Sequence, residues 1–378
     1  MHTPLAATPS ASAERMPLDR IARTRAVGAL IGRVAALLLV ATLPIVFSAW
    51  IDPLRLVTPR RSERELARTL ATGAYVTDFS NYDDRAIEKY LAPLRGARPD
   101  VLALGSSRMQ PLSASAFPGT VFVNGAMRAG MLDDEIAVYG LYDRPERRPR
   151  RVVLNVDPWS ESYDGTSGWL SIGDERDAVL RRSGIPVSPL RDRLTLIRRA
   201  LRRLVSPEYF RLSVFSLRRY GPHGMPWRVT DRAQNAEKTK LPNGTVVWTD
   251  LPADNADRAA HRFAANLMQD ERFLNLDQRR PGRRDALELF VRYLKSEGIT
   301  VTLVLVPFPT EVYDAFVRLP GYPVTSVERD LRAMAARTGA QIAGSYDPRR
   351  AGVVTRDFFD EDHLRPVALA RLVGPRTR

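Results

Sequence analysis

Asp-Val-Leu-Ala-Leu-Gly-Ser-Ser-Arg, residues 100–108, is the stretch that decides the fold. It begins with a short apolar run, which predicts a buried strand, and it ends in small polar residues that leave the strand. Similar runs recur downstream, with helical segments between them, at residues 120–123, 151–154, 299–306 and 340–343. This alternation predicts an α/β fold, with a five-stranded, mainly parallel sheet that is covered by helices on both faces.

Small polar residues follow several of these predicted strands. In open parallel sheets, ligands bind beyond the carboxyl ends of the strands. Those ends carry Ser106, Ser107, Asn124, Asp157 and Asp347. The sequence therefore predicts a site along that edge of the sheet. Helices are expected at residues 133–142, 287–297, 327–338 and 366–373, and a mostly helical approach segment at residues 63–90.

The βα rhythm breaks between about residues 159 and 283, which we interpret as a largely helical insertion over the strand ends. Residues 190–204 predict a strongly basic helix, interpreted as a solvated face. Residues 240–248 predict a hairpin that turns at Asn243-Gly244. The insertion could shape a substrate cleft, act as a lid without a chemical role, or dock a partner.

The N-terminal region predicts a membrane anchor at residues 27–51, after a disordered tail at residues 1–25. No charged residue occurs in residues 34–51. At about 1.5 Å per residue, this helix nearly spans a hydrocarbon core of about 30 Å. A signal peptide cleaved before Ala49 is one alternative, although the preceding region is long for it. A buried core helix is the other, but the segment shows no polar face.

Charged residues around this segment bear on its orientation. Arginines precede it at positions 15, 20, 23, 25 and 33. By the positive-inside rule, they place the N-terminus in the cytoplasm and the following domain, residues 60–378, on the opposite side of the membrane. Arg55, Arg60 and Arg61 follow the segment and weaken this asymmetry.

The composition excludes several classes of protein and of site. The 378 residues are 44% hydrophobic and 26% charged, an ordinary globular balance, and they include no cysteine. Disulfides and thiolate chemistry are therefore excluded. Four histidines, at positions 2, 223, 261 and 363, do not favour a multi-histidine metal site, and no cofactor is expected. The net charge of +14 suits anionic partners. No nucleic-acid-binding motif accompanies it, so nucleic acid is not an expected partner.

A hydroxyl nucleophile needs a base that takes its proton and a third group that orients that base. His363 is the histidine that follows a late predicted strand on a loop at the same end of the sheet. Asp360 precedes it by three residues, a spacing that lets the loop fold the carboxylate back onto the imidazole. Asp357 and Asp362 are rival partners that the spacing does not exclude.

Gly105-Ser106-Ser107-Arg108 and Asp360-x-x-His363 together resemble the SGNH (GDSL-like) hydrolase superfamily. Within it, the pattern resembles a membrane-anchored bacterial branch related to cell-envelope polysaccharide O-acetylation proteins. The resemblance covers about residues 95–160 and 285–375, and it reaches neither the anchor nor the insertion. It implies a flavodoxin-like αβα sandwich and ester chemistry on acyl groups, often acetyl groups on sugars.

The resemblance also implies roles for individual residues. Ser107 matches the nucleophile, and its N–H would form part of the oxyanion hole. The Asn124-Gly125-Ala126 turn matches the second block, which normally gives a glycine N–H to that hole. Asp157 stands where the third block usually has an asparagine. An ionised aspartate would repel the oxyanion, so Asp157 has another role, Asn155 replaces it, or activity is weak.

Two further residues complete this assignment. His363 matches the catalytic base, and Asp360 matches the carboxylate that orients it. Arg108, directly after the matched nucleophile, is interpreted as one half of a structural salt bridge.

Two functions follow as hypotheses. In the first, a domain anchored in a bacterial inner membrane and facing the periplasm or cell exterior removes or transfers an acyl group. Its substrate would be an acylated polysaccharide or another ester. In the second, the same fold is a non-catalytic glycan-binding or assembly protein. It would partner a membrane acyltransferase or a polysaccharide export complex, as Asp157 and the arginine-rich insertion suggest.

Overall fold

The computed structural model describes most of the chain, in the ranges 18–53, 61–79, 82–161, 168–222, 227–249, 252–267, 281–318 and 324–374. Most of the predicted tail, residues 1–25, lies outside these ranges, and so do parts of the predicted insertion.

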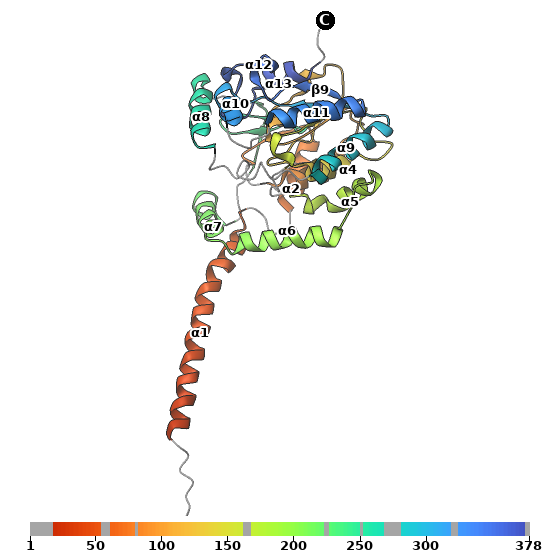
Figure 1. The fold of residues 1–378 in the computed structure, drawn as a ribbon. Helices are drawn as coiled ribbons and strands as arrows, with labels where there is room; N and C mark the ends of the chain where they lie inside the picture. The colour runs from red at the N-terminus through yellow and green to blue at the C-terminus, as the bar shows by residue number, and fades with distance from the viewer. Residues whose placement is uncertain are drawn as a thin grey trace, which may run out of the picture.

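A five-stranded parallel sheet forms the centre of the domain (Figure 1). Its strands are β2 (Val101–Leu104), β3 (Phe122–Asn124), β4 (Arg151–Asn155), β8 (Thr300–Leu305) and β9 (Gln341–Gly344). They pair in the order β3-β2-β4-β8-β9, all parallel. Counted along the chain within this sheet, the order is 2-1-3-4-5, as in flavodoxin-like folds. The predicted fold class and all five predicted strands are confirmed, with small shifts at the strand ends.

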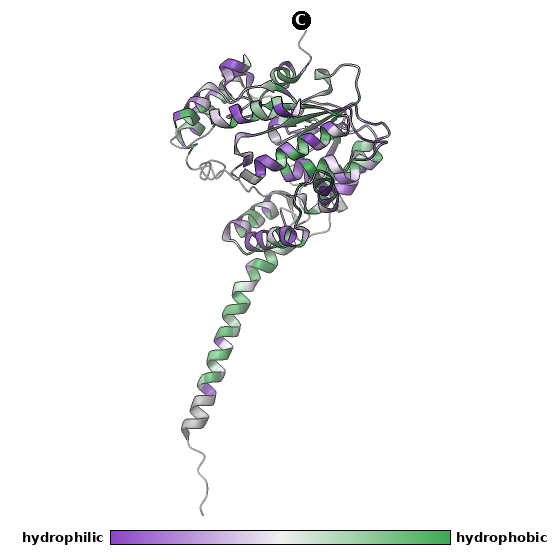
Figure 2. Ribbon diagram, turned by 45° about the vertical axis from the view of Figure 1, so that its right-hand side comes forward, coloured by the Kyte–Doolittle hydropathy of each residue, from purple (hydrophilic) through white to green (hydrophobic). Residues whose placement is uncertain are grey.

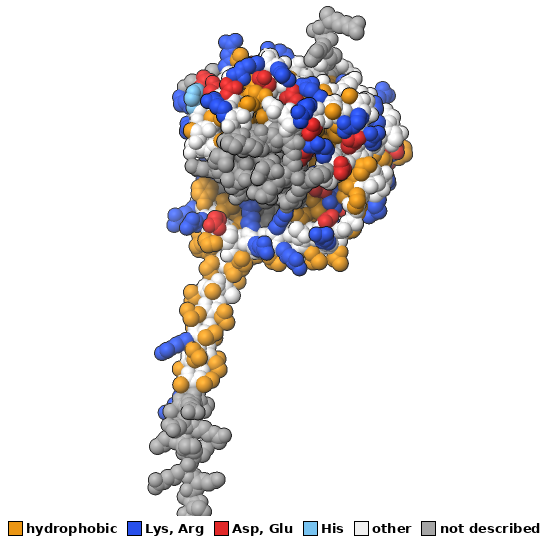
Figure 3. Space-filling view, in the orientation of Figure 1, with side chains coloured by type: hydrophobic (Ala, Val, Ile, Leu, Met, Phe, Trp, Pro, Cys, Tyr) orange, Lys and Arg blue, Asp and Glu red, His pale blue; other side chains and the backbone are white. Residues whose placement is uncertain are grey.

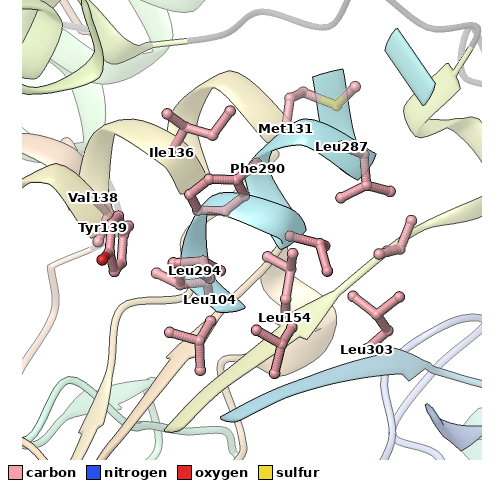
Figure 4. Packing of buried hydrophobic residues seen from close by; sticks show 14 of the residues in the cluster. Leu104, Met131, Ile136, Val138, Tyr139, Leu154, Leu287, Phe290, Leu294 and Leu303 are labelled. Atoms are coloured by element: carbon pink, nitrogen blue, oxygen red, sulfur yellow. The ribbon is translucent and has the colours of Figure 1, made fainter. Parts of the chain in front are cut away.

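Helices cover both faces of this sheet. They are α4 (Leu132–Gly140), α9 (Pro281–Ser296), α10 (Thr310–Arg318), α11 (Val324–Thr338), α12 (Pro348–Ala351) and α13 (Pro366–Val373). Alternate residues of a strand point to opposite faces. Leu102 and Leu104 therefore join the core beneath α4 and α9 (Figure 4), whereas Val101 and Ala103 join the core beneath α13. Burial on both faces explains why β2 is a continuous apolar run.

A second, antiparallel sheet was not predicted. It consists of β1 (Tyr75–Thr77), β5 (Arg228–Thr230), β6 (Thr239–Lys240) and β7 (Val246–Val247), in the order β5-β1-β6-β7. β1 lies between α2 (Arg61–Ala71) and α3 (Asp84–Leu91), so the approach segment is mostly helical, as expected, but contains a strand. β6 and β7 confirm the predicted hairpin, with Asn243-Gly244 in its turn.

The remaining described helices of the insertion are α5 (Gly173–Arg182), α6 (Pro189–Leu204), α7 (Pro207–Tyr220) and α8 (Ala253–Ala265). α6 confirms the predicted basic helix at 190–204. Together with β5, β6 and β7, these helices make the described part of the insertion a mixture of helix and short strands rather than helix alone.

The N-terminal helix α1 (Leu18–Ile51) projects from the domain as a long stalk (Figure 1), and most of its coloured residues are hydrophobic (Figure 2). Its segment Arg25–Ile51 is long and apolar enough to cross a membrane. Only 11% of its apolar window is buried, so the alternative of a buried core helix is wrong. The helix begins at Leu18, and therefore takes in the last residues of the predicted disordered tail.

Candidate active site

The turn after β2 places Ser107 at the carboxyl edge of the sheet. Gly105 has a φ of 154°, and a Cβ there would lie 2.6 Å from the Cβ of Asn155, so only glycine lets the chain pass so closely over β4. A short 3₁₀ helix follows at Ser107–Met109, and Ser106 caps it by accepting the N–H of Arg108. Ser106 is buried, whereas Ser107 is partly exposed.

Ser107, His363 and Asp360 come together although 256 positions separate the serine from the histidine. Ser107 Oγ lies 2.9 Å from His363 Nε2, and His363 Nδ1 lies 2.9 and 3.0 Å from the two carboxylate oxygens of Asp360. The same carboxylate accepts the backbone N–H groups of Asp362 and His363. These bonds fix the carboxylate, which in turn orients the imidazole. The geometry is that of a nucleophile, a base and an orienting acid.

A second carboxylate shares the imidazole. Asp362 is 3% exposed, and its Oδ1 lies 2.7 Å from His363 Nδ1. The other rival, Asp357, is used elsewhere, because it accepts the N–H of Val354 and pairs with Arg371. The structure therefore places two of the three candidate carboxylates at His363.

These carboxylates set the charge of the imidazole. Burial by itself lowers the pKa of His363, but Asp362 and Asp360 outweigh burial and raise this pKa to about 9. At neutral pH, His363 is therefore mostly an imidazolium, which is stable against the two carboxylates. It becomes a proton acceptor for Ser107 only as the pH approaches 9.

Arg108 connects the segments that carry the site. Its guanidinium donates to Asp157 Oδ1 at 2.9 Å, to the carbonyl oxygen of Asp362 at 3.0 Å and to the carbonyl oxygens of Val306 and Pro307 at 2.8 and 2.5 Å. Arg108 is 1% exposed and Asp157 is 4% exposed. The serine turn, the ends of β4 and β8 and the histidine loop are thus joined by one buried cation.

This pairing gives Asp157 a structural role. We expected an ionised aspartate here to repel an oxyanion or to serve another purpose. Arg108 neutralises it, and Asn155 Nδ2 also donates to its Oδ1 at 3.4 Å. Asp157 therefore holds the cation that ties the site together. Asp347 is also structural, because it caps α12.

The predicted oxyanion donors of the second block are engaged within the chain. The Gly125 N–H donates to the carbonyl oxygen of Ala103, and the Ala126 N–H donates to the Oδ1 of Asn124. Their assignment to the oxyanion hole is therefore corrected, because both N–H groups already donate hydrogen bonds within the chain. The N–H of Ser107 has no hydrogen-bond partner among the described residues. Of the predicted oxyanion-hole donors, it is therefore the one that is still available.

Asn124 and Asn155 support the site from beneath. The side-chain amide of Asn124 donates to the carbonyl oxygens of Met109, Gln110 and Leu112 and so braces the segment after Ser107. Asn155 accepts from Ser106 Oγ at 3.2 Å and donates to the carbonyl oxygen of Val304. Both side chains are buried. The amide of Asn155 is used within the chain and does not replace an oxyanion donor.

The insertion contributes residues that the sequence analysis missed. Trp248, directly after β7, lies 4.3 Å from the His363 ring and stacks on Phe359. Lys238 lies 3.1 Å from the centroid of the Trp248 ring. Burial lowers the pKa of Lys238 to about 8, against the attraction of Asp360. The aromatic residue at the end of the predicted hairpin was the available signal for this contact.

The hairpin turn docks directly on the carboxyl end of β3. The N–H of Asn124 donates to the carbonyl oxygen of Asn243 at 2.7 Å, and Thr245 Oγ1 donates to that of Leu112 at 3.0 Å. Lys240, 3% exposed, pairs with Asp84 at 3.2 Å. The hairpin is thus part of the wall of the site.

Asp360, Asp362 and His363 also form the group of described residues whose ligand-type atoms lie close enough to hold a metal ion, within 4.8 Å of one another.

Comparison with known proteins adds no relative. No protein-family model, no curated protein and no solved structure matches the chain.

Proposed function

We propose that the chain is a membrane-anchored serine esterase or O-acyltransferase that acts on acyl esters through Ser107. The observation that carries this proposal is the contact of 2.9 Å between Ser107 Oγ and His363 Nε2, with Asp360 behind the imidazole. Three side chains from two distant segments of the chain are arranged in the order that hydroxyl activation requires. The SGNH resemblance supports the same chemistry.

The reaction follows from the positions of these groups. Neutral His363 takes the proton from Ser107 as its Oγ attacks the ester carbonyl. The Ser107 N–H stabilises the oxyanion, and the imidazolium gives its proton to the leaving alcohol as the acyl-enzyme forms. Water or a sugar hydroxyl then attacks the acyl-enzyme, with His363 again as base. The attacking group decides between hydrolysis and transfer.

The substrate class rests on the resemblance and on α1. SGNH proteins of the similar branch imply acetyl groups on an envelope polysaccharide, and an anchor in the bacterial inner membrane would present the domain to such a polymer in the periplasm. Asp157 and the arginine-rich insertion were the reasons to consider a non-catalytic glycan-binding protein. The pairing of Asp157 with Arg108 supports catalysis instead, so esterase or transferase chemistry is the function we propose.

The experiment measures p-nitrophenyl acetate hydrolysis at pH 9 by the full chain in detergent. Ser107→Ala and His363→Ala should each lower kcat by at least about 10³-fold. His261→Ala is the matched control, because His261 is exposed on α8 and would contribute only surface-catalysed background. Equal rates in the wild type and in all three variants would contradict the proposal.

A further inference from the structure

One face of α6 carries large hydrophobic side chains in contact with solvent. Leu190 is 72% exposed, Leu194 43%, Ile197 46%, Leu201 55% and Val205, just beyond the helix, 56%. At about 100° per residue, these five positions fall within an arc of about 80°. We call them the α6 stripe. Leu196, on the other side of the helix, is buried and joins the core.

Cations border the α6 stripe on one side. Arg191, Arg198 and Arg202 are exposed and lie next to the stripe on the helical wheel. The acidic residue of the helix, Asp192, faces the domain, where it pairs with Arg176 at 3.3 Å. An apolar stripe with arginines along its edge, and with its carboxylate turned inward, is the pattern of a helix that lies in a membrane interface.

α6 lies close to the end of α1, the helix that is long and apolar enough to cross a membrane. α6 is joined through Val205 and Ser206 to α7, and α7 packs on the last turn of α1. The rings of Phe47 and Phe210 are 5.6 Å apart, and Tyr209 Oη donates to Asp52 Oδ1 at 2.7 Å. α6 therefore lies at the level where the apolar helix α1 meets the domain (Figure 1).

The surrounding surface agrees with this position. Trp50 is 61% exposed at the end of α1, and Phe215 is 59% exposed on α7. Aromatic residues are enriched where proteins cross from hydrocarbon to water. Hydrophobic and basic side chains also alternate along the lower edge of the domain, on the side from which α1 extends (Figure 3).

We propose that α6 is an interfacial helix, which inserts the α6 stripe into the membrane that α1 spans and binds anionic phospholipid headgroups through Arg191, Arg198 and Arg202. Insertion removes the exposed stripe from water, and the arginine stems let their charges reach the headgroups. The domain is then attached at two points rather than by a tether alone, which sets its orientation on the surface. The proposal is independent of the chemistry at Ser107.

The absence of native cysteine allows a direct test in the full chain. Single variants Leu194→Cys and Leu201→Cys carry an environment-sensitive fluorophore in nanodiscs of phosphatidylcholine and phosphatidylglycerol. Two control positions are also exposed hydrophobic residues. Leu38→Cys, in α1, is 62% exposed in the structure, and Val367→Cys, on α13, is 73% exposed. The readout is quenching by brominated acyl chains.

The proposal predicts about two-fold or greater quenching at positions 38, 194 and 201 and none at 367. Omitting phosphatidylglycerol should lower quenching at 194 and 201 but not at 38, because only α6 depends on charge. Quenching at 38 with none at 194 and 201 would overturn the proposal and leave the anchor intact. Labels at 194 and 201 that are shielded from water but unquenched would indicate a protein partner, and would also overturn it. No quenching at 38 would refute the spanning helix on which the proposal depends.

Discussion

Raising the pH should destabilise the folded chain through His363. Its pKa is about 9 in the folded state, against an ordinary value of 6.5. A group whose pKa is raised on folding contributes stability that is fully present below the unfolded pKa and lost as the pH rises through the folded pKa. This difference between the folded and the ordinary pKa corresponds to about 3–4 kcal/mol, at about 1.4 kcal/mol per pH unit. This stability should decline from pH 6.5 and be lost above pH 9.

The assay is urea unfolding of the detergent-solubilised chain between pH 6 and pH 10, for the wild type and for His363→Gln. Other groups titrate in both proteins, so the difference between their free energies of unfolding isolates His363. That difference should fall by about 3–4 kcal/mol across the range. A difference that does not change with pH would refute the reasoning. Asp362→Asn removes one of the two carboxylates, so it should move the decline to lower pH.

The same titration should control ester hydrolysis. Below the pKa of His363, the neutral fraction rises about tenfold for each pH unit. Enzymatic hydrolysis should therefore rise up to about pH 9, and Asp362→Asn should shift this rise to lower pH, as in the unfolding experiment. A rate that reaches its plateau near pH 6.5 in the wild type would show that the carboxylates do not act on the imidazole as the structure indicates.

Two further predictions concern the framework of the site. Arg108→Met should lower the free energy of unfolding by about 3–5 kcal/mol, because it leaves Asp157 buried without its cation, and adding Asp157→Asn should recover part of this loss in urea titrations. A double variant no more stable than the single one would contradict this explanation. Gly244→Ala should lower the midpoint of thermal unfolding, because Gly244 has a φ of +92° and a Cβ there would lie 2.0 Å from the carbonyl oxygen of Asn124. Gly282→Ala is its control, with open space around the added carbon, and equal midpoints for the two variants would show that the hairpin turn does not pack on β3.

Local patterns in the sequence predicted the parallel sheet but not the antiparallel one. A strand such as β8, with five buried residues in succession, can be predicted from its own apolar composition. The hairpin of β6 and β7 was predicted from its Asn243-Gly244 turn, but its pairing with β1 was not, because β1 is short and its partners lie more than 150 positions away. Such short strands are stabilised by tertiary packing, which no local pattern contains.

The candidate site also has a part that local patterns predicted and a part that depends on tertiary contacts. The positions of Ser107, Asp360 and His363 at one edge of the sheet follow from the strand order and from a three-residue spacing. Whether the N–H of Gly125 is free depends on a carbonyl group of the neighbouring strand, which the sequence does not reveal. Arg108 was expected to form a structural salt bridge, but its partner could be named only once β2 and β4 were side by side.

Covalent labelling of the full chain at pH 9 by a fluorophosphonate tests the central claim most directly. This reagent phosphonylates serines that an adjacent base has activated. Peptide mass spectrometry should find the adduct on Ser107, with none on the neighbouring Ser106, and labelling should be lost in His363→Ala. Absence of an adduct on Ser107 in the folded wild type, or equal labelling in His363→Ala, would contradict the account.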